Sequence, residues 1–221
     1  MPEVTRLERQ EKNAERVNIY LDGEFAFGLN EMDAARLRIG QELTPEVLAE
    51  LQHSDAIEKA VERAVNLLSY RPRSTGEIRE KLTEKEIPEA AIDAAISKLT
   101  RLGYLDDHQF ARFWVEDRLR NRPRGRRALQ FELRQKGIAD SLINEVLDDL
   151  LDESQAAYEA AESRVRRMRG ATRQEFKQKV GAFLQRRGFG FEASNRALQS
   201  LIQDIEAEDE QYFTEPQSGW D

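Results

Sequence analysis

The sequence contains no cysteine, which excludes disulfide bonds, thiolate metal sites and cysteine nucleophiles. Only two histidines are present, His53 and His108. His108 follows Asp106 and Asp107, a combination that could hold a metal ion. Acidic residues are also typical of a helix N-terminus, where the helix dipole favours negative charge, and we prefer this interpretation. No constellation of catalytic residues is found, so we expect a protein without enzyme activity, metal or cofactor.

Long apolar runs are also absent, and none approaches the roughly 20 residues that a membrane-spanning helix needs. The first residues, MPEVTRLERQEKNAER, contain no apolar core of a signal peptide. We therefore expect a cytoplasmic protein with no membrane partner.

Charge is distributed unevenly along the chain. Hydrophobic residues make up 39% and charged residues 34%, a composition that suits small helical bundles with thin cores. The formal net charge is −8. Residues 112–136 nevertheless contain nine basic and three acidic residues, whereas residues 203–221 contain seven acidic residues and no Lys or Arg. A polyanion would therefore meet a basic middle segment rather than the average charge of the chain.

The first 55 residues predict a small β-rich segment. Residues 4–9 alternate apolar and polar side chains, as a half-buried strand does. In RVNIYLDGEFAFGL, residues 16–29, Asp22-Gly23 lies between two alternating runs. This dipeptide favours a tight hairpin turn, in which both central residues need positive φ. A three-stranded meander is therefore expected, followed by two short helices near residues 31–37 and 44–51.

A repeat with a 51-residue spacing begins at about residue 56. When Leu82, Leu133 and Leu184 are aligned, apolar residues coincide in four further columns, which predicts three equivalent units. The dipeptides Lys85-Glu86, Lys136-Gly137 and Arg187-Gly188 fall in register too. The further apolar columns are Ile78, Leu129 and Val180; Ile87, Ile138 and Phe189; Ile96, Leu147 and Leu198; and Leu99, Leu150 and Leu201.

Each unit is predicted to contain three helices. In the first unit, helical spacing covers residues 56–68, Ser74 begins a capping-box pattern and Pro88 opens the third helix. Asp140 is expected to cap the third helix of the second unit, and Thr172 begins another capping box in the third. The expected fold class is mostly α, with three tandem three-helix repeats in an elongated array after the β-rich segment.

The expected boundaries follow from the repeat. They are residues 1–55 for the β-rich segment, then 56–106, 107–153 and 154–206 for the three repeats. Residues 207–221 lack periodicity and are expected to form an acidic tail that is disordered or loosely docked.

One segment is unusually rich in arginine, since six of the ten residues 118–127 (RLRNRPRGRR) are arginine. Neighbouring like charges repel one another, so this run should lower stability unless an anion binds. Guanidinium groups form paired hydrogen bonds with phosphate and carboxylate groups. A solvated basic face without a ligand is the alternative. A second run follows one repeat later, and we call both together the arginine strip: Arg118, Arg120, Arg122, Arg124, Arg126, Arg127, Arg164, Arg166, Arg167, Arg169 and Arg173.

Three aromatic residues, Phe110, Phe113 and Trp114, have the spacing of one helical face. Exposed aromatic rings could stack on nucleic-acid bases. The spacing is more typical of a buried core, and we expect that role.

Several segments, in this order, resemble RecX proteins. They are LSYRPRS (68–74), EKL (80–82), LGYLDD (102–107) with Phe110-Ala111, GRR (125–127) and LRQKGI (133–138). The resemblance covers about residues 56–205, and its third repeat is the least similar. RecX proteins consist of tandem three-helix repeats, in agreement with the 51-residue register. Compact members lack a β-rich N-terminal segment, whereas longer members carry one.

The resemblance implies a regulator that binds in the groove of the RecA recombinase filament on DNA. Such a protein modulates, and most often inhibits, recombination and ATP hydrolysis by RecA without catalysis of its own. A monomer is expected, with single- and double-stranded DNA as weaker partners. Two alternatives remain open: a direct, sequence-nonspecific DNA-binding protein that uses its arginine-rich face, and a hydrolase with an unrecognised site. The acidic residues 204–221 could compete for the arginine strip as a weak internal brake.

Overall fold

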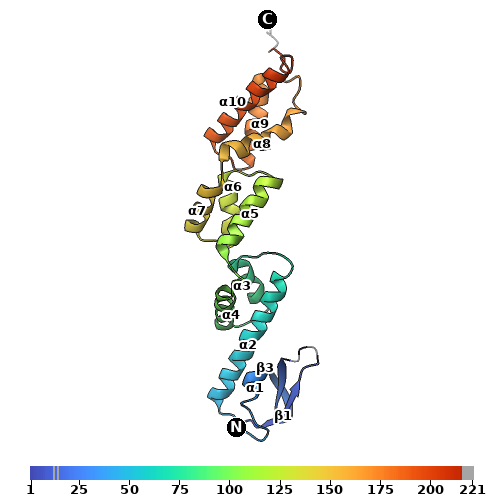
Figure 1. The fold of residues 1–221 in the computed structure, drawn as a ribbon, viewed down its shortest axis with the longest axis vertical. Coiled ribbons are helices and arrows are strands. Elements are labelled where there is room, and N and C mark those ends of the chain that lie inside the picture. Colours follow the sequence, from blue (N-terminus) through green and yellow to red (C-terminus); the bar gives the residue numbers. More distant parts are fainter. Residues whose placement is uncertain (12, 14, 216–221) are drawn as a thin grey trace. The chain divides into compact units, whose positions relative to one another are not determined.

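The computed structural model describes residues 1–11, 13 and 15–215, which form two compact units (Figure 1). Unit 1 is Met1–Asp106 and unit 2 is Asp107–Asp221.

Unit 1 begins with the expected antiparallel meander. Strands β1 (Val4–Arg9), β2 (Arg16–Leu21) and β3 (Glu24–Asn30) pair in the order β1-β2-β3. Asp22 and Gly23 have φ values of 48° and 89°, so both central residues of the β2–β3 turn are left-handed, as the Asp-Gly sequence predicts. The short helix α1 (Glu31–Ala34) follows β3 directly.

A single long helix, α2 (Pro45–Leu68), replaces the two helices expected on either side of residue 55. Residues 52–55 contain no Gly or Pro that would end a helix, so the chain continues through the expected boundary. The N-terminal half of α2 packs Leu48 and Leu51 against the core of the sheet. Its C-terminal half contributes Ala60 and Ala64 to the core of the first repeat. One helix therefore belongs to both parts of unit 1.

A buried ion pair joins this helix to the sheet. Arg16 on β2 contacts Asp55 on α2, and the two residues are only 7% and 5% exposed. Lys59 reaches the second carboxylate oxygen of Asp55 at 2.7 Å. The sequence pattern did not indicate this contact, because Asp55 lies at the position where a boundary was expected.

The three-helix repeats are present in the expected order. The first consists of the C-terminal part of α2 with α3 (Thr75–Thr83) and α4 (Glu89–Arg101). The second contains α5 (Asp107–Asn121), α6 (Arg126–Gln135) and α7 (Asp140–Leu150). The third contains α8 (Glu153–Val165), α9 (Arg173–Arg186) and α10 (Phe191–Glu208).

Burial confirms the 51-residue register. Leu82, Leu133 and Leu184 are 1%, 0% and 0% exposed. Ser74 and Thr172 cap their helices as predicted, and Thr172 forms a complete capping box with Glu175. The prediction for Asp140 was wrong, since Ala139 holds the cap position and Asp140 is the first helical residue. Its carboxylate accepts a hydrogen bond from Arg134 Nε at 2.6 Å instead.

The C-terminal segment is more ordered than its acidic composition suggests. Helix α10 continues to Glu208, and Tyr212 is buried in the core of the third repeat at 4% exposure. Tyr212 donates a hydrogen bond from its hydroxyl to the carbonyl of Val165 at 2.5 Å. Residues 207–215 are therefore docked on the third repeat rather than disordered, and residues 216–221 lie outside the described part of the chain.

Candidate functional site

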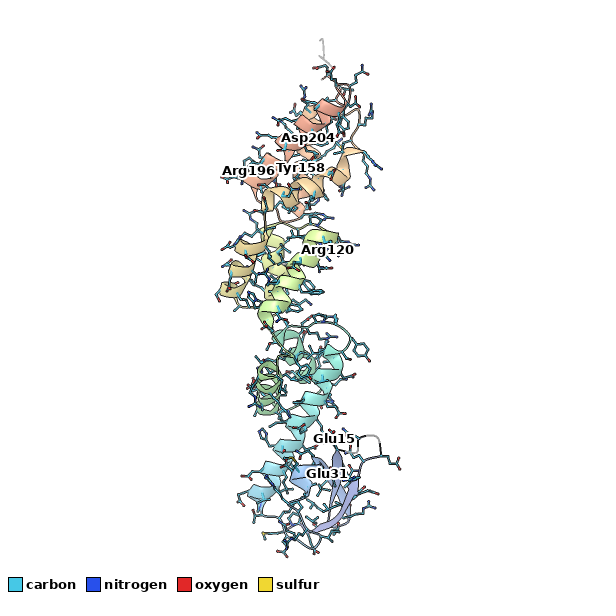
Figure 2. The ribbon with its side chains drawn as sticks, in the orientation of Figure 1. Glu15, Glu31, Arg120, Tyr158, Arg196 and Asp204 are labelled. Atoms are coloured by element: carbon cyan, nitrogen blue, oxygen red, sulfur yellow. The ribbon has the colours of Figure 1, made fainter. Side chains whose placement is uncertain are left out.

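The first arginine run occupies the turn between α5 and α6. Pro123 and Gly125 keep this turn out of helical geometry, so the arginines on either side lie close together. Three of the six side chains are exposed and three are half-buried. The exposed ones are Arg120, which Figure 2 shows on α5, Arg122 and Arg127; the half-buried ones are Arg118, Arg124 and Arg126.

The half-buried arginines of this run contact carboxylates. Arg118 donates to Glu132 at 2.8 Å and to Asp117 at 2.9 Å, and its guanidinium carbon lies 4.1 Å from the centre of the Trp114 ring. The Trp114 indole donates to the same Glu132 oxygen at 2.8 Å. Arg126 donates to Asp148 at 2.6 Å, and Arg124 Nε lies 3.7 Å from the other Glu132 oxygen. Part of the strip therefore stabilises the second repeat.

The second arginine run divides in the same way. Arg169 forms an ion pair with Asp209 at 2.6 Å, and Arg173 forms one with Glu206. Acidic residues of the C-terminal segment therefore neutralise two arginines of the strip. Six arginines of the strip have no carboxylate partner among the described residues: Arg120, Arg122, Arg127, Arg164, Arg166 and Arg167.

A backbone contact, which we call the glycine junction, brings the two repeats of unit 2 together. The amide of Gly125 donates to the carbonyl of Arg187 at 3.0 Å, and the amide of Arg127 donates to the carbonyl of Gly188 at 3.2 Å. One carboxylate oxygen of Glu153, the first residue of α8, accepts from the amides of Arg126 and Gly190, both at 3.0 Å. These amides belong to the N-terminal ends of α6 and α10, where backbone donors otherwise lack a helical partner.

The junction adds Arg187, which was not among the predicted site residues. Its Nη1 donates to the carbonyl of Pro123 at 3.0 Å, and its guanidinium carbon lies 4.9 Å from the Phe183 ring. Burial lowers the pKa of Arg187, and the nearby charges of Arg124, Arg164 and Arg122 lower it further. In the repeat alignment, Arg187-Gly188 coincides with Lys136-Gly137. This coincidence predicts the end of a helix but not the contact between Arg187 and Pro123.

Negative charge gathers in a separate groove of unit 2. The groove has a volume of about 1290 Å³ and is lined by the end of α7, the segment between α7 and α8, and residues of α8 and α10. Tyr158 donates to Asp204 there at 2.9 Å, and this hydrogen bond, burial and nearby carboxylates raise the pKa of the Tyr158 hydroxyl. Figure 2 labels both residues together with Arg196, which also lines the groove.

The aromatic residues of α5 divide between the core and the surface. Phe110 is 3% exposed and stacks on half-buried Trp114 with ring centres 5.9 Å apart. Phe113 is 50% exposed, so its expected place in the core was wrong. Because Ala111 and Val115 are also buried, the apolar stripe of the helix turns away from Phe113.

No group of three or more His, Cys, Asp or Glu side chains in the described part of the chain is placed to hold a metal ion. No helix among the same residues is long and apolar enough to cross a membrane.

A small antiparallel sheet followed by three-helix repeats with a basic turn defines a protein of tandem three-helix domains. Comparison with known proteins identifies which one. The chain matches the models for the Regulatory protein RecX N-terminal domain over residues 2–44 and for the first, second and third three-helix domains of RecX over residues 55–99, 106–147 and 152–198. The chain belongs to the RecX family of regulatory proteins.

Relatives over nearly the whole chain agree with this assignment. Regulatory protein RecX of Bacillus pumilus is 36% identical over 215 residues, covering 96% of this chain and 82% of the relative. That of Lactobacillus gasseri is also 36% identical, covering 96% and 79%. A crystal structure of regulatory protein RecX is 31% identical, with a TM-score of 0.71, and covers 92% of this chain and 100% of that one. RecX from Lactobacillus salivarius has a TM-score of 0.62 at 26% identity, covering 67% and 98%.

Proposed function

We propose that this chain binds the RecA recombinase filament on DNA and inhibits its recombination and ATPase activity. It acts by binding, as a monomer in the cytoplasm, and performs no reaction of its own. Membership of a family of regulatory proteins supports this proposal. DNA alone is the weaker partner, because a filament presents phosphates and protein carboxylates together.

The observation that carries the proposal is the set of arginines without a carboxylate partner among the described residues. The chain has a net charge of −8, so carboxylates are plentiful, yet Arg120, Arg122 and Arg127 remain exposed beside one turn. Crowding of like charges destabilises the folded state unless an external anion neutralises them. A DNA-bound filament supplies such anions.

Inhibition of ATP hydrolysis by RecA on single-stranded DNA tests this proposal. The variant Arg120→Ala/Arg122→Ala/Arg127→Ala should need at least roughly tenfold more protein for half-inhibition, because each lost phosphate contact weakens binding severalfold at moderate salt. The matched control is Arg79→Ala/Arg112→Ala/Arg134→Ala, which removes three arginines that already contact Asp93, Asp149 and Asp140. It loses the same charge and should inhibit almost normally.

Three outcomes separate the alternatives. No inhibition by the unaltered protein, even in excess over the filament, would refute the proposed function. Equal loss of inhibition in both variants would mean that total charge matters and the strip does not. An equal loss of affinity for naked DNA and for filaments would favour the plain DNA-binding protein.

A further inference from the structure

Four guanidinium groups from the two repeats of unit 2 meet at the glycine junction. Arg122 and Arg124 come from the turn before α6, Arg164 from the end of α8, and Arg187 from the end of α9. We call them the junction arginines. Arg164 and Arg187 both lie over the Phe183 ring, with guanidinium carbons 4.1 Å and 4.9 Å from its centre. The buried ring and the Pro123 carbonyl therefore position cations from separate helices in one place.

The junction arginines are at most weakly neutralised within the described part of the chain, since Arg124 has only a distant carboxylate, Glu132 at 3.7 Å. Arg122 and Arg164 have no ion-pair partner in the described part of the chain. Arg124 Nε is buried and has no hydrogen-bond partner there, and the Glu132 oxygen at 3.7 Å is too far to accept one. Glu132 itself already accepts from Trp114 and Arg118. A buried donor without a partner costs free energy, and a bound oxyanion would supply the missing acceptor.

Two hollows flank this group of cations. One, of about 250 Å³, lies on the second repeat and is lined by Asp117, Arg118, Asn121, Arg122 and Arg124. Asp117 is occupied there by Arg118 and Asn121, at 2.9 and 2.8 Å. The other hollow, of about 230 Å³, lies on the third repeat, and its basic lining residues are Arg164, Arg167, Lys179 and Arg186.

We infer that the junction arginines form one oxyanion site that binds a phosphodiester group of a DNA strand, with neighbouring phosphates in the two flanking hollows. This inference rests on the proposed function and identifies the anion that this part of the strip contacts. The four junction arginines offer donors only, because a guanidinium group has no acceptor that could select a base. Binding is therefore independent of base sequence.

The repeated arrangement of cations favours a phosphodiester chain over a protein carboxylate. A lone carboxylate is satisfied by one bidentate arginine, which leaves the other junction arginines unpaired. A nucleic-acid strand carries a regular series of single charges, and hollows with several arginines on the second and on the third repeat match such a series. The backbone hydrogen bonds of the glycine junction hold the second and third repeats together, and with them the two hollows.

Fluorescence anisotropy with a fluorescein-labelled oligothymidine, measured over a series of sodium chloride concentrations, tests the site. In Arg122→Ala/Arg164→Ala, the slope of log affinity against log salt should fall by about 0.7 for each arginine, which is about fivefold in affinity per arginine at 0.1 M salt. Arg187→Gln, which removes the charge but keeps a polar side chain, should lose about as much affinity as the loss of one arginine. Circular dichroism verifies that each variant is folded.

A gain of affinity and a matched loss of charge serve as controls. Glu132→Gln keeps an acceptor for Trp114 but removes the charge nearest Arg124, so it should bind the oligonucleotide up to about fivefold more tightly. Misfolding cannot produce that result. Arg112→Ala/Arg196→Ala removes two charges from other faces of unit 2 and should leave the salt slope unchanged.

The two proposals fail in different ways. A salt slope in Arg122→Ala/Arg164→Ala equal to that of the control would overturn the phosphodiester site. If filament inhibition were lost in the same variant, the arginines would contact the recombinase itself, and only the proposed function would stand. A lower slope with unchanged inhibition of RecA would support the phosphodiester site and remove it from the regulatory mechanism.

Discussion

Gly125 and Gly188 lie so close together that neither position has room for a side chain. A Cβ on Gly125 would lie 2.3 Å from the carbonyl carbon of Gly188 and 2.2 Å from the amide nitrogen of Phe189. A Cβ on Gly188 would lie 2.5 Å from the amide nitrogen of Ala128, and Gly188 also has a φ of +83°. These obstacles are backbone atoms, which cannot rotate away. The contact therefore requires glycine on both sides, and the placement of the junction arginines depends on it.

Replacing Gly125 with alanine should separate the two repeats of unit 2. We expect Gly125→Ala to lower the free energy of unfolding by about 1–3 kcal/mol, the usual cost of forcing an atom into packed structure. Gly181→Ala is the matched control, because its Cβ would meet Leu198 at an ordinary 3.7 Å. Alanine inside a helix should stabilise by about 0.5–1 kcal/mol. Urea unfolding measures both, and equal stabilities would contradict the tight junction.

The aligned leucines should be equivalent in energy as well as in position. Truncation of Leu133, which is fully buried, should destabilise by about 2–5 kcal/mol through lost burial and the cavity left behind. Leu82→Ala and Leu184→Ala should fall in the same range. Leu102→Ala, at a position 57% exposed, should cost less than about 0.5 kcal/mol. Peptide-resolved hydrogen exchange would locate each effect, and a near-neutral Leu184→Ala would break the equivalence.

The sequence predicted features that depend on local chemistry or on burial periodicity. The turn at Asp22 was predictable because few residue pairs accept two successive positive φ values. The equivalence of Leu82 and Leu133 was predictable because each repeat must bury the same helical face.

Features that depend on tertiary contacts were not predictable in the same way. The continuity of α2 was not predicted, because the sequence pattern changes at residue 55 as it does at the end of an element. Arg187 was not predicted as a site residue, because its position depends on a contact with the backbone of Gly125 in the preceding repeat. The packing of Tyr212 was not predicted, because the burial of one aromatic ring holds the segment in place although most residues around it are acidic.

Asp55 should be essential for the packing of α2 against the sheet. Asp55→Ala leaves Arg16 buried without its carboxylate, which should destabilise unit 1 by about 3–5 kcal/mol. The double variant Arg16→Met/Asp55→Leu replaces both charges with apolar groups and should recover most of that loss. Glu62→Ala, on the exposed side of α2, is the control. Hydrogen exchange in β2 and α2 measures the effect, and a double variant as unstable as Asp55→Ala would show that the charges themselves are required.

The C-terminal segment should loosen at alkaline pH through Tyr212. Burial raises the pKa of its hydroxyl above the ordinary value of 10.0, while the charge of Arg169 acts in the opposite direction. A raised folded-state pKa means that the stabilising contribution is complete below pH 10.0 and is lost as the pH rises through the folded-state value. The hydrogen bond to Val165 is lost with the same proton.

Tyr212→Phe separates these effects. At neutral pH the variant should be less stable by about 1 kcal/mol, because it lacks one buried hydrogen bond. Phenylalanine has no proton to lose, so the difference in melting temperature should shrink as the pH rises above about 10. Tyr104→Phe, at a position 60% exposed, serves as the control and should show no such change with pH. Melting temperatures measured across this range decide the matter, since a difference that stayed constant would mean that the Tyr212 hydroxyl does not titrate against folding.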